Sequence, residues 1–194
     1  MKKRIIVGLS GASGVIYGIR TLLHLSAMDD VETHLVMSEG ARITIPIETS
    51  YDAAVVADLA DVVYRADNLA APIASGSFMT EGMIVIPCSV KSLSGIVHSY
   101  ADNLLARAAD VCLKEKRKLV LAVRETPLHK GHLKLMVDAA DLGAHILPPV
   151  PAFYHQPKTI EDLIDQSIGK AFDYLGLDHD LFQRWGEPPT AGRD

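Results

Sequence analysis

Three serine-bearing turns are the part of this chain best suited to bind an anionic ligand. The first, SGASG at residues 10–14, follows an apolar run at residues 5–9; the second contains Ser38, and the third is PCSVKSLSG at residues 87–95. Small residues between a strand and a helix bring backbone N–H groups to the positive end of the helix, where anions bind. Each serine alone is more typical of an ordinary helix cap. The three turns together indicate a phosphorylated ligand, and we expect its phosphate at the first turn.

The spacing of the glycines narrows the class of ligand. Gly8, Gly11 and Gly14 lie three residues apart, so the G-x-G-x-x-G pattern of dinucleotide sites is absent, as is the G-x-x-x-x-G-K-[ST] pattern of triphosphate sites. Glu39 stands one place late for the acidic residue that binds a dinucleotide ribose. Arg124, in the segment VRETPLHKGHL, adds a guanidinium after a later apolar run. These features favour a mononucleotide, and FMN over NAD.

Other candidate groups leave alternatives open. His129 and His132 are three residues apart, but no third His or Cys stands at ligand spacing, so solvated imidazoles at a helix start are favoured over a metal site. No aspartate-rich D-D-x-x-D run for magnesium diphosphate is present. Glu48 follows an apolar run and is either a buried carboxylate with a raised pKa or a plain surface residue. Tyr154 lies in a proline-punctuated loop, where a structural and a functional role are equally compatible with the sequence.

The elements that must position these residues follow from the apolar pattern. Nearly continuous apolar runs, which are typical of parallel strands buried on both faces, stand at residues 5–9, 33–37, 83–87, 119–123 and 144–147. Helical patterns stand at residues 15–27, 40–47, 52–59, 90–97, 103–115, 132–142 and 159–175. The alternation predicts an α/β fold with a doubly wound parallel sheet, whose ligands lie beyond the carboxyl ends of the strands. The stretches 65–80, 148–157 and 186–194 are predicted as loop or tail, and residues 1–194 as a single domain.

Composition excludes several classes of function. A net charge of −5, with no basic run of five residues, argues against a nucleic acid partner. Cys88 and Cys112 have no metal or redox spacing and are expected to be buried thiols of a cytoplasmic protein. The chain shows no signal segment and no apolar run of about 18 residues, so no membrane association is expected. The mean hydropathy of +0.17 is high for a monomer of this size and indicates apolar surface buried between subunits.

Segments in order along nearly the whole chain match a known family, and the most specific of them are PCSVKSLSGI, RAADVCLKE and PAFYHQP. Through these segments the chain resembles the flavin prenyltransferases of the UbiX/Pad group, long described as subunits of aromatic-acid decarboxylases. The resemblance implies a Rossmann-like, flavodoxin-related domain that binds reduced FMN. The implied reaction joins a dimethylallyl group from dimethylallyl monophosphate to N5 and C6 of the flavin. Its product, prenylated FMN, is the cofactor of a UbiD-type decarboxylase.

The resemblance also implies roles for individual residues. Contacts to FMN would come from Gly11, Ala12, Ser13, Ser38, Ser89, Val90, Lys91, Ser92 and Arg124. The prenyl phosphate would be bound by Arg107, Lys114, Tyr154 and Lys170, with Glu125 beside them and Trp185 lining the site. Catalysis would depend on Ser13, Glu48 and Glu125. Glu48 is favoured to take the proton that C6 loses, with Ser13 as its relay.

The implied enzyme needs no metal and works as a homo-oligomer, commonly a dodecamer, whose sites are assembled between neighbouring subunits. Residues 179–194 are expected to pack on a neighbour. Two other functions stay open: an FMN-dependent cysteine decarboxylase of the related flavoprotein class, and a non-catalytic flavin-carrying subunit of an aromatic-acid decarboxylase. The PASANT substrate motif of cysteine decarboxylases has no counterpart here, since the corresponding loop reads ASGSFM. The sequence leaves open the pathway served and the choice between a monophosphate and a diphosphate donor.

Overall fold

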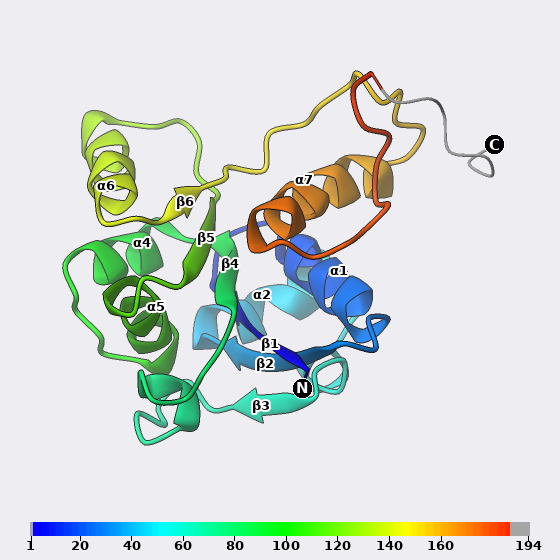
Figure 1. The fold of residues 1–194 in the computed structure, drawn as a ribbon. Helices are drawn as coiled ribbons and strands as arrows, with labels where there is room; N and C mark the ends of the chain where they lie inside the picture. The colour runs from blue at the N-terminus through cyan, green and yellow to red at the C-terminus, as the bar shows by residue number, and fades with distance from the viewer. Residues whose placement is uncertain (1, 187–194) are drawn as a thin grey trace.

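One parallel sheet organises residues 2–186, the part of the chain that this computed structural model describes (Figure 1). Its six strands lie in the order β3-β2-β1-β4-β5-β6, and every neighbouring pair is parallel. The order runs one way from β1 to β3 and the other way from β4 to β6, so it reverses between β1 and β4. Ligands of such sheets bind beyond the carboxyl ends of the strands at this reversal. The strands are β1 Lys3–Leu9, β2 Val31–Met37, β3 Val62–Tyr64, β4 Gly82–Cys88, β5 Lys118–Val123 and β6 His145–Ile146.

Helices cover both faces of the sheet (Figure 1). The helices on one face are α1 (Val15–Ser26), α2 (Glu39–Glu48), α3 (Ala53–Ala57) and α7 (Ile160–Leu175). Those on the other face are α4 (Val90–Val97), α5 (Leu104–Lys114), α6 (Lys130–Asp141) and the short 3-10 helix η1 (Pro72–Ala74). Each set closes its own hydrophobic core over the sheet.

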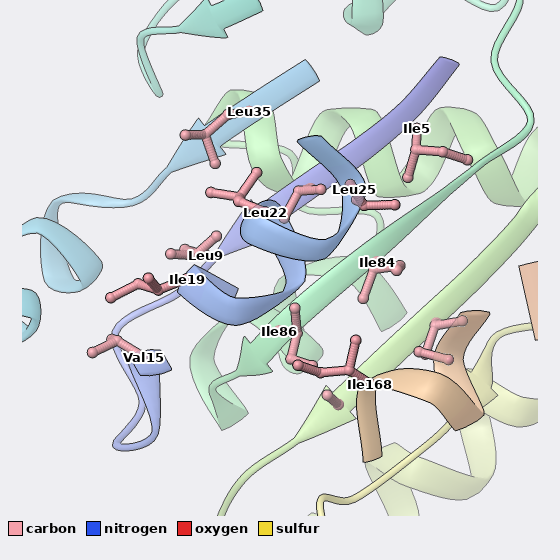
Figure 2. Close-up of a cluster of buried hydrophobic side chains, with 14 of the residues drawn as sticks. Ile5, Leu9, Val15, Ile19, Leu22, Leu25, Leu35, Ile84, Ile86 and Ile168 are labelled. Carbon is pink, nitrogen blue, oxygen red and sulfur yellow. The ribbon is translucent and has the colours of Figure 1, made fainter. Parts of the chain in front are cut away.

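Strand β1 shows why the central strands read as continuous apolar runs. Ile5, Val7 and Leu9 are fully buried in the core under α1, where Figure 2 shows Ile5 and Leu9 beside the helix. Ile6, between them, belongs to the core on the opposite face. Successive side chains of a strand point to opposite faces, so a strand covered on both sides has no polar set of positions. The predicted doubly wound α/β sheet is confirmed.

The structure adds short elements that the apolar pattern does not reveal. Strand β3 has three residues at the edge of the sheet, none of them fully buried, so it carries no apolar run to recognise. Helix η1 lies inside the predicted loop 65–80. Helix α6 begins at Lys130, two residues before its predicted start, because the His129 side chain accepts the Gly131 N–H and caps the helix.

The C-terminal segment folds back on its own chain. Leu177 and Phe182 are buried. Gly169 of α7 makes this approach possible, because a Cβ at that position would lie 2.6 Å from a ring carbon of Phe182. The packing of residues 179–194 on a neighbouring copy stays a prediction, and residues 187–194 lie outside the described part of the chain.

An ion-pair cluster fastens α7 to α1. The Asp165 carboxylate accepts hydrogen bonds from Arg20 Nε at 2.7 Å and from His24 Nε2 at 2.9 Å. Burial raises the pKa of Asp165, but the hydrogen bonds from His24 and Arg20 more than offset it, so the pKa lies below the ordinary value of 3.8. The carboxylate is therefore charged at neutral pH, and its removal would leave the Arg20 guanidinium partly buried without its partner.

Asp165→Asn is expected to lower the free energy of unfolding by about 2 kcal/mol at pH 7, because a charge-assisted pair is lost. Since the folded-state pKa of Asp165 is lowered, its contribution is present above about pH 4 and is lost as the pH falls through the folded-state value. Urea midpoints of wild type and variant should therefore differ at pH 7 and converge once the pH has fallen below the folded-state pKa of Asp165. Asp67→Asn is the control, because its pair with Arg65 is exposed and should contribute little. Equal midpoint shifts for the two variants would contradict this role of Asp165.

Candidate active site

A buried serine joins the two turns that flank the reversal of the sheet. Ser10, 1% exposed, donates from Oγ to the Pro87 carbonyl at 2.9 Å and accepts the Ser89 N–H at 2.7 Å. Its own N–H donates to the same carbonyl at 3.2 Å. The turns after β1 and β4, which carry predicted flavin contacts, are thus held side by side. Nothing local in the sequence marks Ser10 for this role, because its partners lie 77 and 79 positions away.

The turn after β1 also touches the turn after β2, and here the contact is between backbones. A Cβ on Gly11 would lie 2.8 Å from Gly40 Cα, and a Cβ on Gly40 would lie 3.1 Å from Gly11 Cα. Ser38 caps α2 beside this contact by accepting the Ala41 N–H at 3.1 Å. The three serine-bearing turns therefore form one continuous surface, as the sequence predicts.

The N-terminus of α4 offers open backbone donors. Ser89 caps the helix by accepting the Ser92 N–H at 3.2 Å, and its hydroxyl donates to Ser92 Oγ. The N–H groups of Val90 and Lys91 have no hydrogen-bond acceptor within residues 2–186. Lys91 is exposed. Free N–H groups, a hydroxyl and an ammonium group at one helix N-terminus suit a single phosphate.

The N-terminus of α1 already holds one of the protein's own carboxylates. Glu48, the last residue of α2, accepts the Gly14 N–H at 2.7 Å and the Val15 N–H at 3.2 Å. Burial raises the pKa of Glu48, but a hydrogen bond from the Ser13 side chain and those two N–H groups bring it below the ordinary value of 4.5. The raised pKa considered from the sequence is therefore wrong. Glu48 is exposed, as the surface alternative held, but its carboxylate caps the N-terminus of α1. The phosphate expected at this helix end has lost these two donors to Glu48.

Arg124, the residue after β5, adds a guanidinium to the three serine-bearing turns. Its N–H donates to the Cys88 carbonyl at 3.0 Å, which fixes it beside the turn after β4. Its guanidinium lies close enough to favour the ionised forms of Glu48 and Tyr17, although burial is the larger influence on Tyr17 and raises that pKa. Tyr17, on the first turn of α1, escaped the sequence analysis, and its place one helical turn after Gly14 is the only local signal. Glu125, next to Arg124, is exposed and accepts the Thr126 N–H at 2.9 Å.

A second group of predicted residues gathers around the end of α7. The rings of Tyr154 and Trp185 meet edge to face, with centroids 5.7 Å apart. Lys170 Nζ donates to Asp173 at 3.2 Å, and the same carboxylate binds Arg184, the residue before Trp185. Three residues expected at the donor site, Tyr154, Lys170 and Trp185, are thus linked within one chain.

Arg107 and Lys114 lie apart from both groups, on α5. Arg107 Nε donates to the Ala74 carbonyl at 3.1 Å, and Lys114, at the C-terminal end of the helix, pairs with Glu115. Lys114 comes four residues before β5 begins, so it lies toward the amino edge of the sheet. Helices α5 and α7 cover opposite faces of the sheet. Lys114 and Lys170 of one chain therefore cannot contact the same phosphate.

Residues 2–186 contain no cluster of three or more His, Cys, Asp or Glu side chains able to hold a metal ion. The rings of His129 and His132 are tilted against each other at the start of α6, with centroids 3.5 Å apart. No helix within this range combines the length and the apolar character that crossing a membrane requires.

Known proteins match the chain over almost its full length. The family model described as Flavoprotein covers residues 1–171. The flavin prenyltransferase UbiX of Salmonella typhimurium is 60% identical over 185 residues, which are 94% of this chain and 98% of that protein. A crystal structure of AnUbiX in complex with FMN and dimethylallyl pyrophosphate has a TM-score of 0.94 at 49% identity, covering 97% of this chain and 100% of that one. A dodecameric FMN-dependent UbiX-like decarboxylase from Escherichia coli O157:H7 has a TM-score of 0.92 at 49% identity, covering 95% and 100%.

The cysteine decarboxylases are more distant. The FMN-dependent cysteine decarboxylase TvaF of thioviridamide biosynthesis is 12% identical, with a TM-score of 0.67 over 91% of this chain and 99% of that one. Similarity at this level shows a shared fold alone. It gives no support to cysteine decarboxylation as the activity of this chain.

Gly11→Ala is expected to weaken FMN binding by about tenfold, because overpacking between two backbones costs on the order of 1–3 kcal/mol. The added Cβ would lie 2.8 Å from Gly40 Cα, a contact that no side-chain rotation relieves. Isothermal titration with FMN measures the change. Gly131→Ala is the matched control, since its Cβ would meet only the His129 ring, also at 2.8 Å, and that ring can rotate away. Unchanged FMN affinity in Gly11→Ala would show that the Gly11–Gly40 contact does not shape the site.

Proposed function

The chain belongs to the flavoprotein family and, within it, to the UbiX flavin prenyltransferases, and from that premise we propose that it transfers a dimethylallyl group from dimethylallyl monophosphate to N5 and C6 of reduced FMN. The observation that carries the proposal is the 60% identity over nearly the whole of both chains. The product, prenylated FMN, would serve a separate UbiD-type decarboxylase.

The carboxyl edge of the sheet fits a flavin mononucleotide. The N–H groups of Val90 and Lys91 and the hydroxyls of Ser38 and Ser92 would hold its single phosphate, while Gly11 to Ser13 and Arg124 would contact the rest of the molecule. Reduced FMN supplies a nucleophilic N5 and an electron-rich ring. The turns after β1 and β2 would orient the flavin, because their backbones approach each other too closely to admit a side chain larger than hydrogen at Gly11.

Ionisation of the allylic C–O bond needs fixed positive charge at the leaving phosphate. Lys170 would provide it beside the phenol of Tyr154, and preorganised cations stabilise a developing anion without reorganisation. The Tyr154 and Trp185 rings would exclude water, which would otherwise capture the allylic cation. A monophosphate carries less charge than a diphosphate, so we propose that these side chains act without a metal ion.

After the bond to N5 has formed, the proton that N5 loses would be returned to the double bond of the attached group, which makes the far carbon electrophilic toward C6. Closure of the second bond would then release the C6 proton, and Glu48 is the residue we assign to accept it. Its carboxylate is held ionised by the Gly14 and Val15 N–H groups and stands in hydrogen-bond contact with the Ser13 hydroxyl. Ser13 would pass the proton to Glu48. The lowered pKa makes Glu48 a weak base, which suffices because a cationic ring adduct is a strong acid.

A complete donor site would need more than one copy of the chain. Arg107 and Lys114 lie on the face opposite Lys170, so a neighbouring copy would supply them. Exposed apolar side chains support such an assembly, notably Ile43 and Ile47 on α2 and Leu133 and Val137 on α6, which are 49–75% exposed. The Escherichia coli relative is dodecameric, and we propose the same assembly here.

The activity is tested by mixing the protein anaerobically with reduced FMN and either dimethylallyl monophosphate or dimethylallyl pyrophosphate, then weighing the flavin. We expect a flavin heavier by one dimethylallyl unit, formed faster from the monophosphate and unaffected by a metal chelator. Heavier flavin from the pyrophosphate alone, or only with added magnesium, would overturn the donor assignment. An unmodified flavin with both donors would overturn the function and favour a flavin-carrying subunit.

Mixed oligomers test the shared donor site. Lys114→Ala and Lys170→Ala should each abolish prenyl transfer while FMN stays bound. Co-expressed in one oligomer, the two variants should recover about a quarter of wild-type activity, because about one site in four then draws both lysines from intact positions on two chains.

Lys170→Ala co-expressed with Tyr154→Ala is the matched control for the mixed oligomers. Tyr154 and Lys170 belong to the same group in one chain, so every site inherits one defect and no recovery is expected. Recovery in the control, or none in the Lys114 and Lys170 pair, would contradict the division of the site between copies.

A further inference from the structure

One carboxylate near the end of α7 gathers several donors. Asp173 Oδ2 accepts from Lys170 Nζ at 3.2 Å and from Arg184 Nη1 at 3.1 Å. Its other oxygen accepts from Arg184 Nη2 at 2.7 Å and from His179 Nε2 at 3.0 Å. The Arg184 pair is bidentate, the geometry that adds direction as well as strength. Asp173 thus ties the C-terminal segment to the helix that carries Lys170.

The surroundings fix this arrangement. The His179 side chain is 2% exposed, and its Nδ1 accepts the Leu181 N–H at 3.2 Å, so the proton on Nε2 points at Asp173. Phe182 is buried against α7, and the Arg184 guanidinium lies 5.3 Å from the centre of its ring. The segment from His179 to Arg184 therefore has a defined path over α7.

That path ends at the predicted donor site. Trp185 follows Arg184 directly, and its ring meets Tyr154 edge to face. Lys170 lies one helical turn before Asp173 and is held by the same carboxylate. The Asp173 side chain thus contacts Lys170, the proposed phosphate-binding cation, directly and is linked to the Trp185 ring through Arg184.

We propose that Asp173 is a positioning residue for the prenyl donor, which sets the direction of the Lys170 ammonium and, through Arg184, the place of Trp185 against Tyr154. This rests on the proposed prenyl transfer. Asp173 places one negative charge between the positive charges of Lys170 and Arg184 and so reduces their mutual repulsion. The three side chains together stay net positive and can still attract a phosphate.

The carboxylate is charged wherever the enzyme would be assayed. Burial raises the pKa of Asp173, but hydrogen bonds from Arg184, Lys170 and His179 lower it to about 2. The opposite expectation is also definite: if Asp173 only neutralised Lys170, its removal would strengthen phosphate binding. The two cases therefore predict opposite changes in the donor KM when the Asp173 carboxylate is removed.

Asp173→Asn should raise the KM for dimethylallyl monophosphate by about tenfold and leave the KM for reduced FMN within about twofold, since a charged hydrogen bond to each cation is lost. Trp185 is the only tryptophan, so its fluorescence anisotropy reports the segment directly. That anisotropy should fall in the variant. Asp173→Glu keeps the charge and should restore much of both signals.

Asp165→Asn is the matched control, because Asp165 is also an ion-paired carboxylate of α7 but binds Arg20 and His24. It should lower stability and leave the donor KM and the Trp185 anisotropy unchanged. In Lys170→Met, which is expected to lose prenyl transfer, the further change Asp173→Asn should weaken equilibrium binding of dimethylallyl monophosphate by less than it does in the wild type, because Lys170 is one of the two side chains through which Asp173 acts.

Three results would overturn the positioning role: a lower donor KM in Asp173→Asn, equal effects of Asp173→Asn and Asp165→Asn, or full additivity with Lys170→Met. Failure of the wild-type protein to prenylate FMN would instead overturn the proposed function. The anisotropy comparison needs no turnover, so it still decides whether Asp173 orders Trp185.

Discussion

The structure depends on the close approach of three strand-to-helix turns at the carboxyl edge of one sheet. The buried Ser10 side chain ties the turn after β1 to the turn after β4 with two hydrogen bonds. Gly11 and Gly40 bring the turns after β1 and β2 into backbone contact. Such proximity replaces side chains with peptide groups as the lining of the site, and peptide groups cannot rotate away. A planar ligand placed there is oriented by the fold itself.

The same edge separates two negative charges by giving each its own helix. The N–H groups at the start of α1 bind the Glu48 carboxylate, while those at the start of α4 stay open. A helix N-terminus holds roughly half a positive charge, so each can stabilise one anion. Glu48, the proposed proton acceptor, and a nucleotide phosphate can therefore share one sheet edge. The phosphate need not raise the pKa of Glu48, and Glu48 need not weaken the binding of the phosphate. Arg124 also favours the ionised form of Glu48.

The sequence predicted what depends on neighbours along the chain. Apolar runs gave the central strands, and Ser38 and Ser89 act as the helix caps their types suggest. The three-residue strand β3 and the short helix η1 were not predicted, because elements this short contain too few residues to show a periodic spacing of apolar side chains. The state of Glu48 could not be predicted either, since its pKa is set by N–H groups 33 and 34 positions away. Family resemblance supplied Arg107 and Lys114, and only the fold shows that they stand on the face opposite Lys170.

That division of the cations has a physical reason within the proposed function. Lys114, Arg107, Lys170 and Arg184 gathered in one chain, without a bound phosphate, would repel one another and lower the stability of the fold. On separate faces the cations are paired locally: Arg107 with Asp110, Lys114 with Glu115, and both Lys170 and Arg184 with Asp173. Each chain can therefore fold before the site exists. In the proposed oligomer, assembly would bring the two sets together where a phosphate can offset them, so donor binding and subunit contact would stabilise each other by linkage.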